Sequence, residues 1–252
     1  MEIKRTALIT GASSGIGMAT AKKIAKDYRL ILCGRRQDRL DELKAILSKE
    51  TEVFTLNFDV RDKEAIFNSI ESLPEEWKSI DILVNNAGNA HGLAPFDEGD
   101  LEDLEAMIDI NVKGLIYVSK AVIPLIKKSK NGHIVNISSI AGKEVYANGT
   151  TYCASKAAVE SLSKGMRYDL LPYGVKVTNV APGAVETEFS LVRFKGDEEK
   201  SSNVYKGFEP LVAEDIADVI AYTLNAPQHV QIADVTIFPK AQAGGTTIFK
   251  NS

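Results

Sequence analysis

Short apolar segments alternate with longer segments of helical periodicity along most of this chain. The apolar segments lie at residues 6–10, 29–33, 52–57, 81–85, 133–138, 175–180 and 234–238. Runs of this length are typical of strands buried on both faces, and helical segments between them can connect parallel neighbours. The pattern predicts an α/β fold, namely one doubly wound, Rossmann-type domain with a seven-stranded parallel sheet and helices on both faces.

The spacing of these segments also predicts one domain over residues 1–252, because neither a Gly/Ser/Pro-rich linker nor a repeat interrupts it. One long interval, from residue 182 to residue 210, is polar and mixed and shows no convincing strand. Loops of this length in a compact domain are usually functional or mobile. We expect a substrate lid at about residues 183–210, and the alternative is a tolerated surface insertion.

Composition narrows the partners that we expect. The net charge of -4, from 30 basic and 34 acidic residues, gives no electrostatic case for nucleic acid or an anionic membrane. Apolar runs are shorter than the roughly 20 residues that span a bilayer, and the N-terminal residues read as a first strand and not as a signal peptide. Two cysteines favour a reducing cytoplasm, and three scattered histidines predict no metal site. A small molecule is the expected partner.

A glycine-rich turn follows the first apolar segment. It reads GASSGIG, with Gly11, Ser13, Ser14, Gly15, Ile16 and Gly17, and a segment of helical spacing comes next. Glycines permit close backbone approach, and a helix N-terminus presents unpaired N–H groups to a phosphate. The turn therefore indicates a dinucleotide site, although its GxxxGxG spacing differs from the commoner GxGxxG and a plain tight connection is the alternative.

Two arginines stand at the end of the second predicted strand. Arg35 and Arg36 follow Gly34, where a carboxylate would suit a free ribose 2′-hydroxyl. Guanidinium groups suit a 2′-phosphate instead. The pair predicts NADP in preference to NAD as the cofactor, while one of the two is expected to be an ordinary solvated arginine.

Tyr152 and Lys156 are spaced by one helical turn in the segment TTYCASKAAVE. A free phenol has a pKa of about 10, and a neighbouring ammonium favours the phenolate. An oxidised nicotinamide would add a second positive charge. We therefore expect Lys156 to lower the pKa of Tyr152 and make it a general acid or base. The alternative is a chance pair on an exposed helix face.

Polar residues at three other places support the same reading. Ser139 follows the fifth predicted strand and can donate a hydrogen bond to a carbonyl oxygen. Asn111 falls inside a predicted helix over residues 104–126, where its amide can hold a water or perturb the backbone. Asn85 to Gly88 form a turn after the fourth predicted strand. Taken singly, these features fit a solvent-facing asparagine or a plain loop equally well.

The ordered set resembles the short-chain dehydrogenase/reductase family over nearly the whole chain. GASSGIG, NNAG, Asn111, Ser139, Tyr152-Cys-Ala-Ser-Lys156 and Pro182-Gly183 stand in the family's order. The resemblance implies a catalytic tetrad of Asn111, Ser139, Tyr152 and Lys156. Ser139 would polarise the substrate oxygen, Tyr152 would exchange its proton, Lys156 would hold the ribose, and Asn111 would position a water. It further implies a cofactor site that includes Asp59, Val60, Asn86, Ala87, Gly88, Pro182, Gly183, Val185 and Thr187.

The interval after Pro182 and the C-terminal segment narrow the resemblance to the NADP-dependent serine/3-hydroxy acid dehydrogenase group. It implies hydride transfer between NADP(H) and the β-carbon hydroxyl or carbonyl of short 3-hydroxy acids. The resemblance does not rank the candidate substrates serine, allo-threonine, 3-hydroxyisobutyrate and 3-hydroxypropionate. It also leaves the direction of the reaction in the cell open. Arg193 or Lys195 is expected to clamp the substrate carboxylate, unless both pair with nearby surface acids. The group also implies a homo-tetramer, which the small residues Ala154, Ala157, Ala158 and Gly165 would permit. Packing of this helix on its own sheet explains the small residues equally well.

Two other functions remain open from the sequence. A broad carbonyl or dicarbonyl reductase that uses NADPH fits the same scaffold. A redox-silent protein that binds NADP without turnover is the other, and the complete tetrad argues against it.

Overall fold

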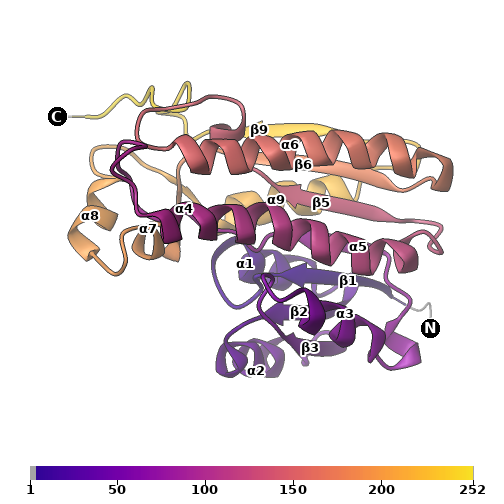
Figure 1. The fold of residues 1–252 in the computed structure, drawn as a ribbon. Coiled ribbons are helices and arrows are strands. Elements are labelled where there is room, and N and C mark those ends of the chain that lie inside the picture. The colour runs from indigo at the N-terminus through magenta and orange to yellow at the C-terminus, as the bar shows by residue number, and fades with distance from the viewer. Residues whose placement is uncertain (1–3, 252) are drawn as a thin grey trace.

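A seven-stranded parallel sheet forms the centre of the computed structural model, which describes residues 4–251 (Figure 1). Its strands are β1 (Arg5–Thr10), β2 (Tyr28–Gly34), β3 (Val53–Asn57), β4 (Ile82–Asn85), β5 (His133–Ile137), β6 (Lys176–Pro182) and β9 (Asp234–Ile237). Their order in the sheet is β3-β2-β1-β4-β5-β6-β9. Each predicted apolar segment contributes one strand, so the predicted α/β fold with one parallel sheet is confirmed.

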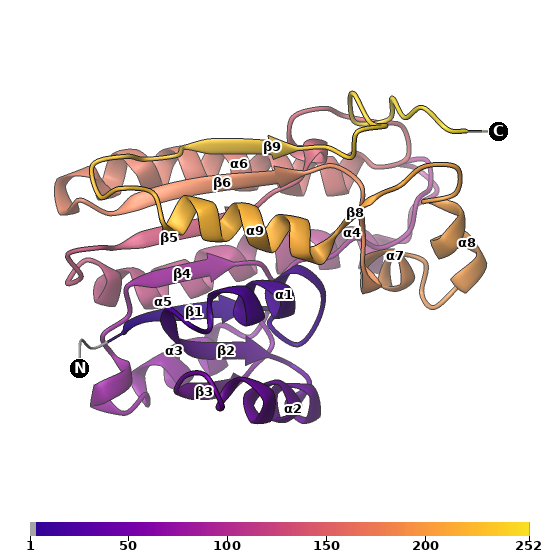
Figure 2. The ribbon, with the colours of Figure 1, turned by 180° about the vertical axis from the view of Figure 1, so that it is seen from behind.

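Helices cover both faces of this sheet. The helices α1 (Gly15–Ile24), α2 (Gln37–Leu47) and α9 (Ala213–Leu224) pack on one face, seen in Figure 2. The helices α3 (Lys63–Glu71), α4 (Leu101–Ile108), α5 (Leu115–Ile126) and α6 (Thr150–Leu170) lie on the other, seen in Figure 1. Three short 3₁₀ turns lie between a helix and a strand of the sheet: η1 (Glu75–Trp77), η3 (Ile140–Gly142) and η4 (Leu171–Tyr173).

Successive residues of the central strands pack into two separate cores. In β1, Leu8 packs in one core with Val122 of α5, and Ile9 packs in the other with Ile220 of α9. All four side chains are fully buried or nearly so. Burial on both faces explains why these strands read as continuous apolar runs and not as alternating patterns.

The sheet order reverses direction at β1. The chain runs outward from β1 to β2 and β3, then returns to pair β4 against the other side of β1. In open parallel sheets such a switch point leaves a crevice beyond the carboxyl ends of the strands. Residues 183–210, for which the sequence predicts a lid and which are called the lid segment below, lie at this end of the molecule (Figure 1).

The predicted helix over residues 104–126 is interrupted. A π-helical turn, Asp109–Gly114, separates α4 from α5. Asn111 lies in this turn and is 2% exposed, so the solvent-facing alternative is wrong. Its Nδ2 donates to Asn89 O at 2.8 Å, and its Oδ1 accepts from Asn89 N at 2.9 Å. The backbone widens where a buried amide takes these partners, as π-bulges do at functional sites.

The lid segment contains more regular structure than its sequence predicts. It holds a two-residue strand β7 (Val185–Glu186), which pairs with β8 (Leu211–Val212), and the helices α7 (Glu188–Arg193) and α8 (Glu198–Asn203). The side chains of Thr187 and Asp197 cap the two helices by accepting from backbone N–H groups. Elements this short leave no periodicity for the sequence to show, so the expectation of no strand was wrong.

Candidate active site

A cleft of about 640 Å³ opens at the carboxyl ends of the strands. It is lined from the N-terminal half by Gly11, Ser13, Ser14, Gly15, Ile16, Arg35, Arg36, Asp59, Val60, Asn86, Ala87 and Gly88. The C-terminal half adds Ser139, Tyr152, Lys156, Pro182, Gly183, Val185, Thr187 and Arg193. Nearly all predicted site residues therefore share one cavity, while Gly17, Asn111 and Lys195 do not line it.

The glycine turn brings the β1–α1 backbone against the neighbouring strand end. Gly11 and Gly15 adopt φ values of +65° and +51°, which favour glycine. A Cβ on Gly17 would collide with Gly11 O and with Asn86 Nδ2, so only glycine fits there. Asn86 Nδ2 donates to Thr10 O at 3.0 Å and ties this turn to β4. The close packing leaves the first turn of α1 facing the cleft, where a phosphate would fit.

Arg36 connects three parts of the cleft. Its Nη2 donates to Ser14 Oγ at 2.8 Å and to Ser13 Oγ at 3.3 Å, at the glycine turn. Its Nη1 donates to Glu188 Oε2 at 3.1 Å, on the lid helix α7. Arg39 Nη1 donates to the other oxygen of the same carboxylate at 2.6 Å. The hydrogen bonds from Arg39 and Arg36 lower the pKa of Glu188 although its partial burial acts to raise it.

Arg35 lies beside a second carboxylate. Arg35 Nη1 donates to Asp59 Oδ2 at 3.3 Å, and Arg61 holds both oxygens of Asp59. Partial burial acts to raise the pKa of Asp59, but the hydrogen bonds from Arg61 and its charge outweigh this and lower it. The cluster at the end of β2 therefore keeps cationic groups at the mouth of the cleft, which fits the phosphate of NADP.

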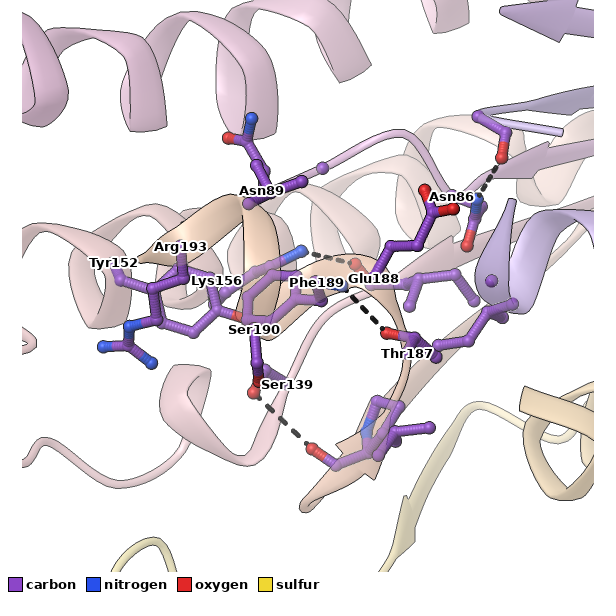
Figure 3. Close-up of a pocket in the computed structure, with 18 of the residues that line it drawn as sticks. Asn86, Asn89, Ser139, Tyr152, Lys156, Thr187, Glu188, Phe189, Ser190 and Arg193 are labelled. Atoms are coloured by element: carbon purple, nitrogen blue, oxygen red, sulfur yellow. Dashed lines mark hydrogen bonds between the residues drawn. The ribbon is translucent and has the colours of Figure 1, made fainter. Parts of the chain in front are cut away.

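Tyr152 and Lys156 lie on one face of α6, as their spacing predicts (Figure 3). Both are buried, with 7% and 5% of their surfaces exposed. Lys156 Nζ donates to Ile137 O at 3.0 Å and lies 6.0 Å from the centre of the Tyr152 ring. Ser139, at the start of η3, donates to Pro182 O at 3.5 Å and accepts from Ala141 N.

The pKa shifts at this pair differ from the prediction. Burial raises the pKa of Tyr152, while the adjacent Ser139 hydroxyl and the Arg193 guanidinium act to lower it. Burial also lowers the pKa of Lys156 to about 8. The expected lowering of the Tyr152 pKa by Lys156 is not found in this structure, because the phenol is buried and the ammonium is turned to the Ile137 carbonyl.

Asn111 lies behind the cleft wall. Its Nδ2 also donates to Ser155 Oγ at 3.0 Å, which connects the π-helical turn to α6. A Cβ on Gly88 would lie 3.0 Å from Asn111 Oδ1 and 3.2 Å from Lys156 Nζ. The turn after β4 therefore passes between these two polar side chains, where a larger residue would separate them.

The two basic residues of the lid have different surroundings. Arg193 lies beside Tyr152, with its Cζ 5.7 Å from the ring centre (Figure 3). Its Nε donates to Gly92 O at 3.1 Å, and its Nη2 donates to Tyr146 OH at 3.4 Å. Lys195 is exposed and pairs with Asp103 at 2.9 Å, outside the cleft. Of the two expected clamps, the structure brings only Arg193 to Tyr152, and Lys195 pairs instead with Asp103 of α4.

Several residues of the cleft were not predicted. Glu188 and Phe189 come from the lid helix, Tyr146 precedes α6, and Gln242 comes from the segment after β9. Gln242 Oε1 accepts from Ala184 N at 2.8 Å and holds the start of the lid. An acidic residue directly after Thr187 was visible in the sequence, but its partners Arg36 and Arg39 were not.

The described residues also bear on metal and membrane binding. Across residues 4–251, histidine, cysteine, aspartate and glutamate side chains form no group of three or more that could hold a metal ion. None of the helices in the same range combines the length and the apolarity that a membrane span needs.

Several known proteins are similar to this chain over nearly its whole length. It is 43% identical over 250 residues to an NADP-dependent 3-hydroxy acid dehydrogenase of Schizosaccharomyces pombe, covering 98% of this chain and 96% of that protein. It is 40% identical over 249 residues to a serine 3-dehydrogenase of Agrobacterium fabrum, covering 98% and 99%. It is 45% identical over 238 residues to sulfoacetaldehyde reductase 2 of Chromohalobacter salexigens, covering 94% of each.

A solved structure agrees with these relatives. The closed form of a serine dehydrogenase complexed with NADP+ superposes with a TM-score of 0.91 at 40% identity, covering 98% of this chain and all of that one. Residues 5–197 also match the sequence profile of the short chain dehydrogenase family. With its glycine turn, its Tyr152 and Lys156 pair and these matches, the chain belongs to the short chain dehydrogenase family.

Proposed function

We propose that this protein is an NADP-dependent oxidoreductase that transfers a hydride between NADP(H) and the β-carbon hydroxyl or carbonyl of short 3-hydroxy acids. The observation that carries the proposal is the meeting of Ser139, Tyr152 and Lys156 with Arg193 in one cleft beneath the lid. A hydroxyl, a phenol and a buried amine supply acid–base chemistry, and the guanidinium supplies a binding site for an acid group.

The cofactor assignment rests on the arginines at the end of β2. Arg36 is turned to Ser13 and Ser14 at the glycine turn, and Arg35 stands beside it. Together they present guanidinium groups and hydroxyls that can bind the 2′-phosphate of NADP. A site for NAD, which has a free ribose 2′-hydroxyl, would instead favour a carboxylate at this position. The NADP-dependent relative and the solved NADP+ complex support the same choice. When bound, NADP supplies the nicotinamide that accepts or gives the hydride.

Each member of the tetrad has a role in this proposal. Ser139 orients the substrate oxygen by donating a hydrogen bond, and Tyr152 passes a proton to or from that oxygen. Lys156 holds the ribose hydroxyls, and its charge together with that of the oxidised cofactor offsets the effect of burial on Tyr152. Asn111 holds the turn at Asn89. Its role in the proposed reaction is to position a water in the proton path.

Substrate class rests on Arg193. Its guanidinium lies beside the phenol of Tyr152, so a carboxylate bound there places the β-carbon of a short acid close to the reacting groups. Three of the relatives are named after a 3-hydroxy acid, serine or sulfoacetaldehyde. Each of these compounds carries an acid group. The shared chemistry favours a short anionic substrate over a neutral ketone.

We further propose a homo-tetramer in the cytoplasm, with residues 183–210 as the substrate lid. The lid is supported by the contacts of Arg193 and Glu188 across the cleft. The tetramer is supported by the exposed residues Ala154, Ala157 and Gly165 on the outer face of α6. The cytoplasm is supported by Cys33 and Cys153, which are both free and buried.

A substrate panel tests the proposal. Short 3-hydroxy acids, their methyl esters and neutral diketones are compared with NADP(H) and NAD(H). We expect the free acids with NADP+ to give the highest kcat/KM and the esters to lose at least tenfold, because a hydrogen-bonded charge pair is worth about 1.5–3 kcal/mol. Diketone turnover above acid turnover would identify a broad carbonyl reductase instead.

A further inference from the structure

Glu188 joins the lid to the cofactor end of the cleft. It stands in the first turn of α7, and its two carboxylate oxygens accept from Arg36 at 3.1 Å and from Arg39 at 2.6 Å. The three side chains come from the lid, the end of β2 and the helix α2, and the lid is more than 140 residues from the other two in the sequence. The bridge links the lid helix to the residues beside the glycine turn.

The charges in this cluster are unequal. In the described part of the chain, four arginines, Arg35, Arg36, Arg39 and Arg61, share only two carboxylate partners in their ion pairs, Asp59 and Glu188. A phosphate monoester carries about -1.5 to -2 at neutral pH. The cluster can therefore hold the 2′-phosphate of NADP while Glu188 keeps its arginine partners.

Arg36 has the geometry to serve both anions in one conformation. Its Nη2 donates hydrogen bonds to the hydroxyls of Ser13 and Ser14 at the glycine turn, while its Nη1 donates to the Glu188 carboxylate. The planar guanidinium fixes these directions relative to each other. An anion that immobilises one edge of the group thereby steadies the partner at the other edge.

The opposite end of the same helix reaches the catalytic tyrosine. Arg193, in the last turn of α7, donates to Gly92 O and lies beside Tyr152, and Gly92 N donates to Arg193 O at 2.9 Å. Figure 3 shows Arg193 beside Tyr152 and the Glu188 side chain extending away from them. One six-residue helix therefore spans from the cofactor arginines to the substrate side.

We infer that Glu188 is a positioning residue through which the 2′-phosphate of NADP orders the lid: the phosphate fixes Arg36, Arg36 and Arg39 hold Glu188, and Glu188 sets α7 and with it Arg193. This inference rests on the proposed NADP dependence. Because coupling between two sites is reciprocal, a closed lid also favours a cofactor with the 2′-phosphate over one without it.

The test uses fragments that carry the adenosine end but lack the nicotinamide. Hydrogen–deuterium exchange of residues 188–206 is followed in the whole protein with 2′,5′-ADP, which has the 2′-phosphate, and with 5′-AMP, which lacks it. We expect 2′,5′-ADP to slow exchange of the lid amides about threefold to fivefold, which is the effect that a partly exposed ion pair can have on this rate. We expect 5′-AMP to leave the exchange rate unchanged.

Two variants separate this coupling from a general charge effect. Glu188→Gln removes the bridge and should abolish the protection by 2′,5′-ADP while the fragment still binds, as measured by calorimetry. Glu186→Gln is the matched control, because Glu186 is exposed on β7 two residues away and should leave the protection intact.

The outcomes distinguish the two proposals. If the wild-type protein fails to bind 2′,5′-ADP, the NADP assignment is wrong and the coupling fails with it. If the fragment binds but the lid exchange is unchanged or faster, or if Glu188→Gln keeps the full protection, the coupling alone is overturned.

Discussion

Lys156 is a charged residue whose burial is unfavourable for the stability of the fold. Its amine is buried against Ile137 O, and burial lowers its pKa from 10.5 to about 8. A shift of this size corresponds to about 3 kcal/mol of unfavourable free energy for the charged native form, relative to the unfolded chain. The proposed role toward the cofactor ribose explains why this cost is tolerated, as active sites often trade stability for function.

Lys156→Met should therefore stabilise the fold at pH 7 while it abolishes turnover. The gain should be at most about 3 kcal/mol in the free energy of unfolding. Between pH 8 and pH 10.5 the native wild type loses its proton before the unfolded chain does, so its stability rises with pH relative to the variant. Urea denaturation of both proteins at pH 7, 9 and 10 measures this difference, and a gap that does not change with pH contradicts the account.

At the scale of elements, a charge cluster holds η3 against α6. Lys143, which follows η3, donates to Glu160 of α6 at 3.0 Å and to Asp234 of β9 at 2.8 Å. Glu160 is 6% exposed and also accepts from Asn179 at 2.8 Å. The cluster fixes the turn that begins at Ser139 relative to the helix that carries Tyr152.

Lys143→Met should leave the Glu160 charge buried without its cation. We expect a loss of about 3 kcal/mol in the free energy of unfolding, together with a lower kcat, because Ser139 is no longer held against α6. Lys200→Met is the control, since Lys200 pairs with Asp197 on the exposed part of the lid and should cost less than about 1 kcal/mol. Urea denaturation and steady-state kinetics measure both, and equal losses in the two variants would contradict the cluster's role.

Elements differ in how far the sequence predicts them. The seven sheet strands were predictable because burial on both faces leaves continuous apolar runs. The π-helical turn was not predictable, because the apolar periodicity continues through it. The only signal was Asn111, which is an unfavourable residue inside a helix. The lid helices α7 and α8 have six residues each, which is too short for a periodic pattern. Their capping residues, Thr187 and Asp197, were the available signals.

At the scale of the whole molecule, the sequence predicts the cleft better than it predicts the lid contacts. Ser139, Tyr152 and Lys156 follow strand ends or a helical spacing, and topology alone brings them together. Glu188 and Gln242 depend on contacts between segments that are far apart in the chain, and no local pattern reports these. Lys195 shows the same limit, because its partner Asp103 lies on α4.

The proposed tetramer makes its own prediction for the outer face of α6. Ala154, Ala157 and Gly165 are exposed there, and Tyr168 is 80% exposed. Among residues 4–251, only Gly165 itself, its chain neighbours and the adjoining backbone of α6 come within 4 Å of the position that a Cβ on Gly165 would take, so a larger residue fits the single chain. Gly165→Arg should keep the fold but reduce the mass in solution below that of a tetramer, as measured by light scattering. A variant that remains tetrameric would show that α6 is not the interface.

In the proposed reaction, Tyr152 moves the proton during hydride transfer. Tyr152→Phe removes one hydroxyl and keeps the ring that packs against Phe189. The most direct measurement is the single-turnover rate of NADPH formation from a 3-hydroxy acid, with NADP+ binding to the same variant titrated in parallel. We expect a rate about 10²- to 10⁴-fold lower with binding within about threefold of the wild type. A variant that binds NADP+ and turns over at the wild-type rate would contradict it.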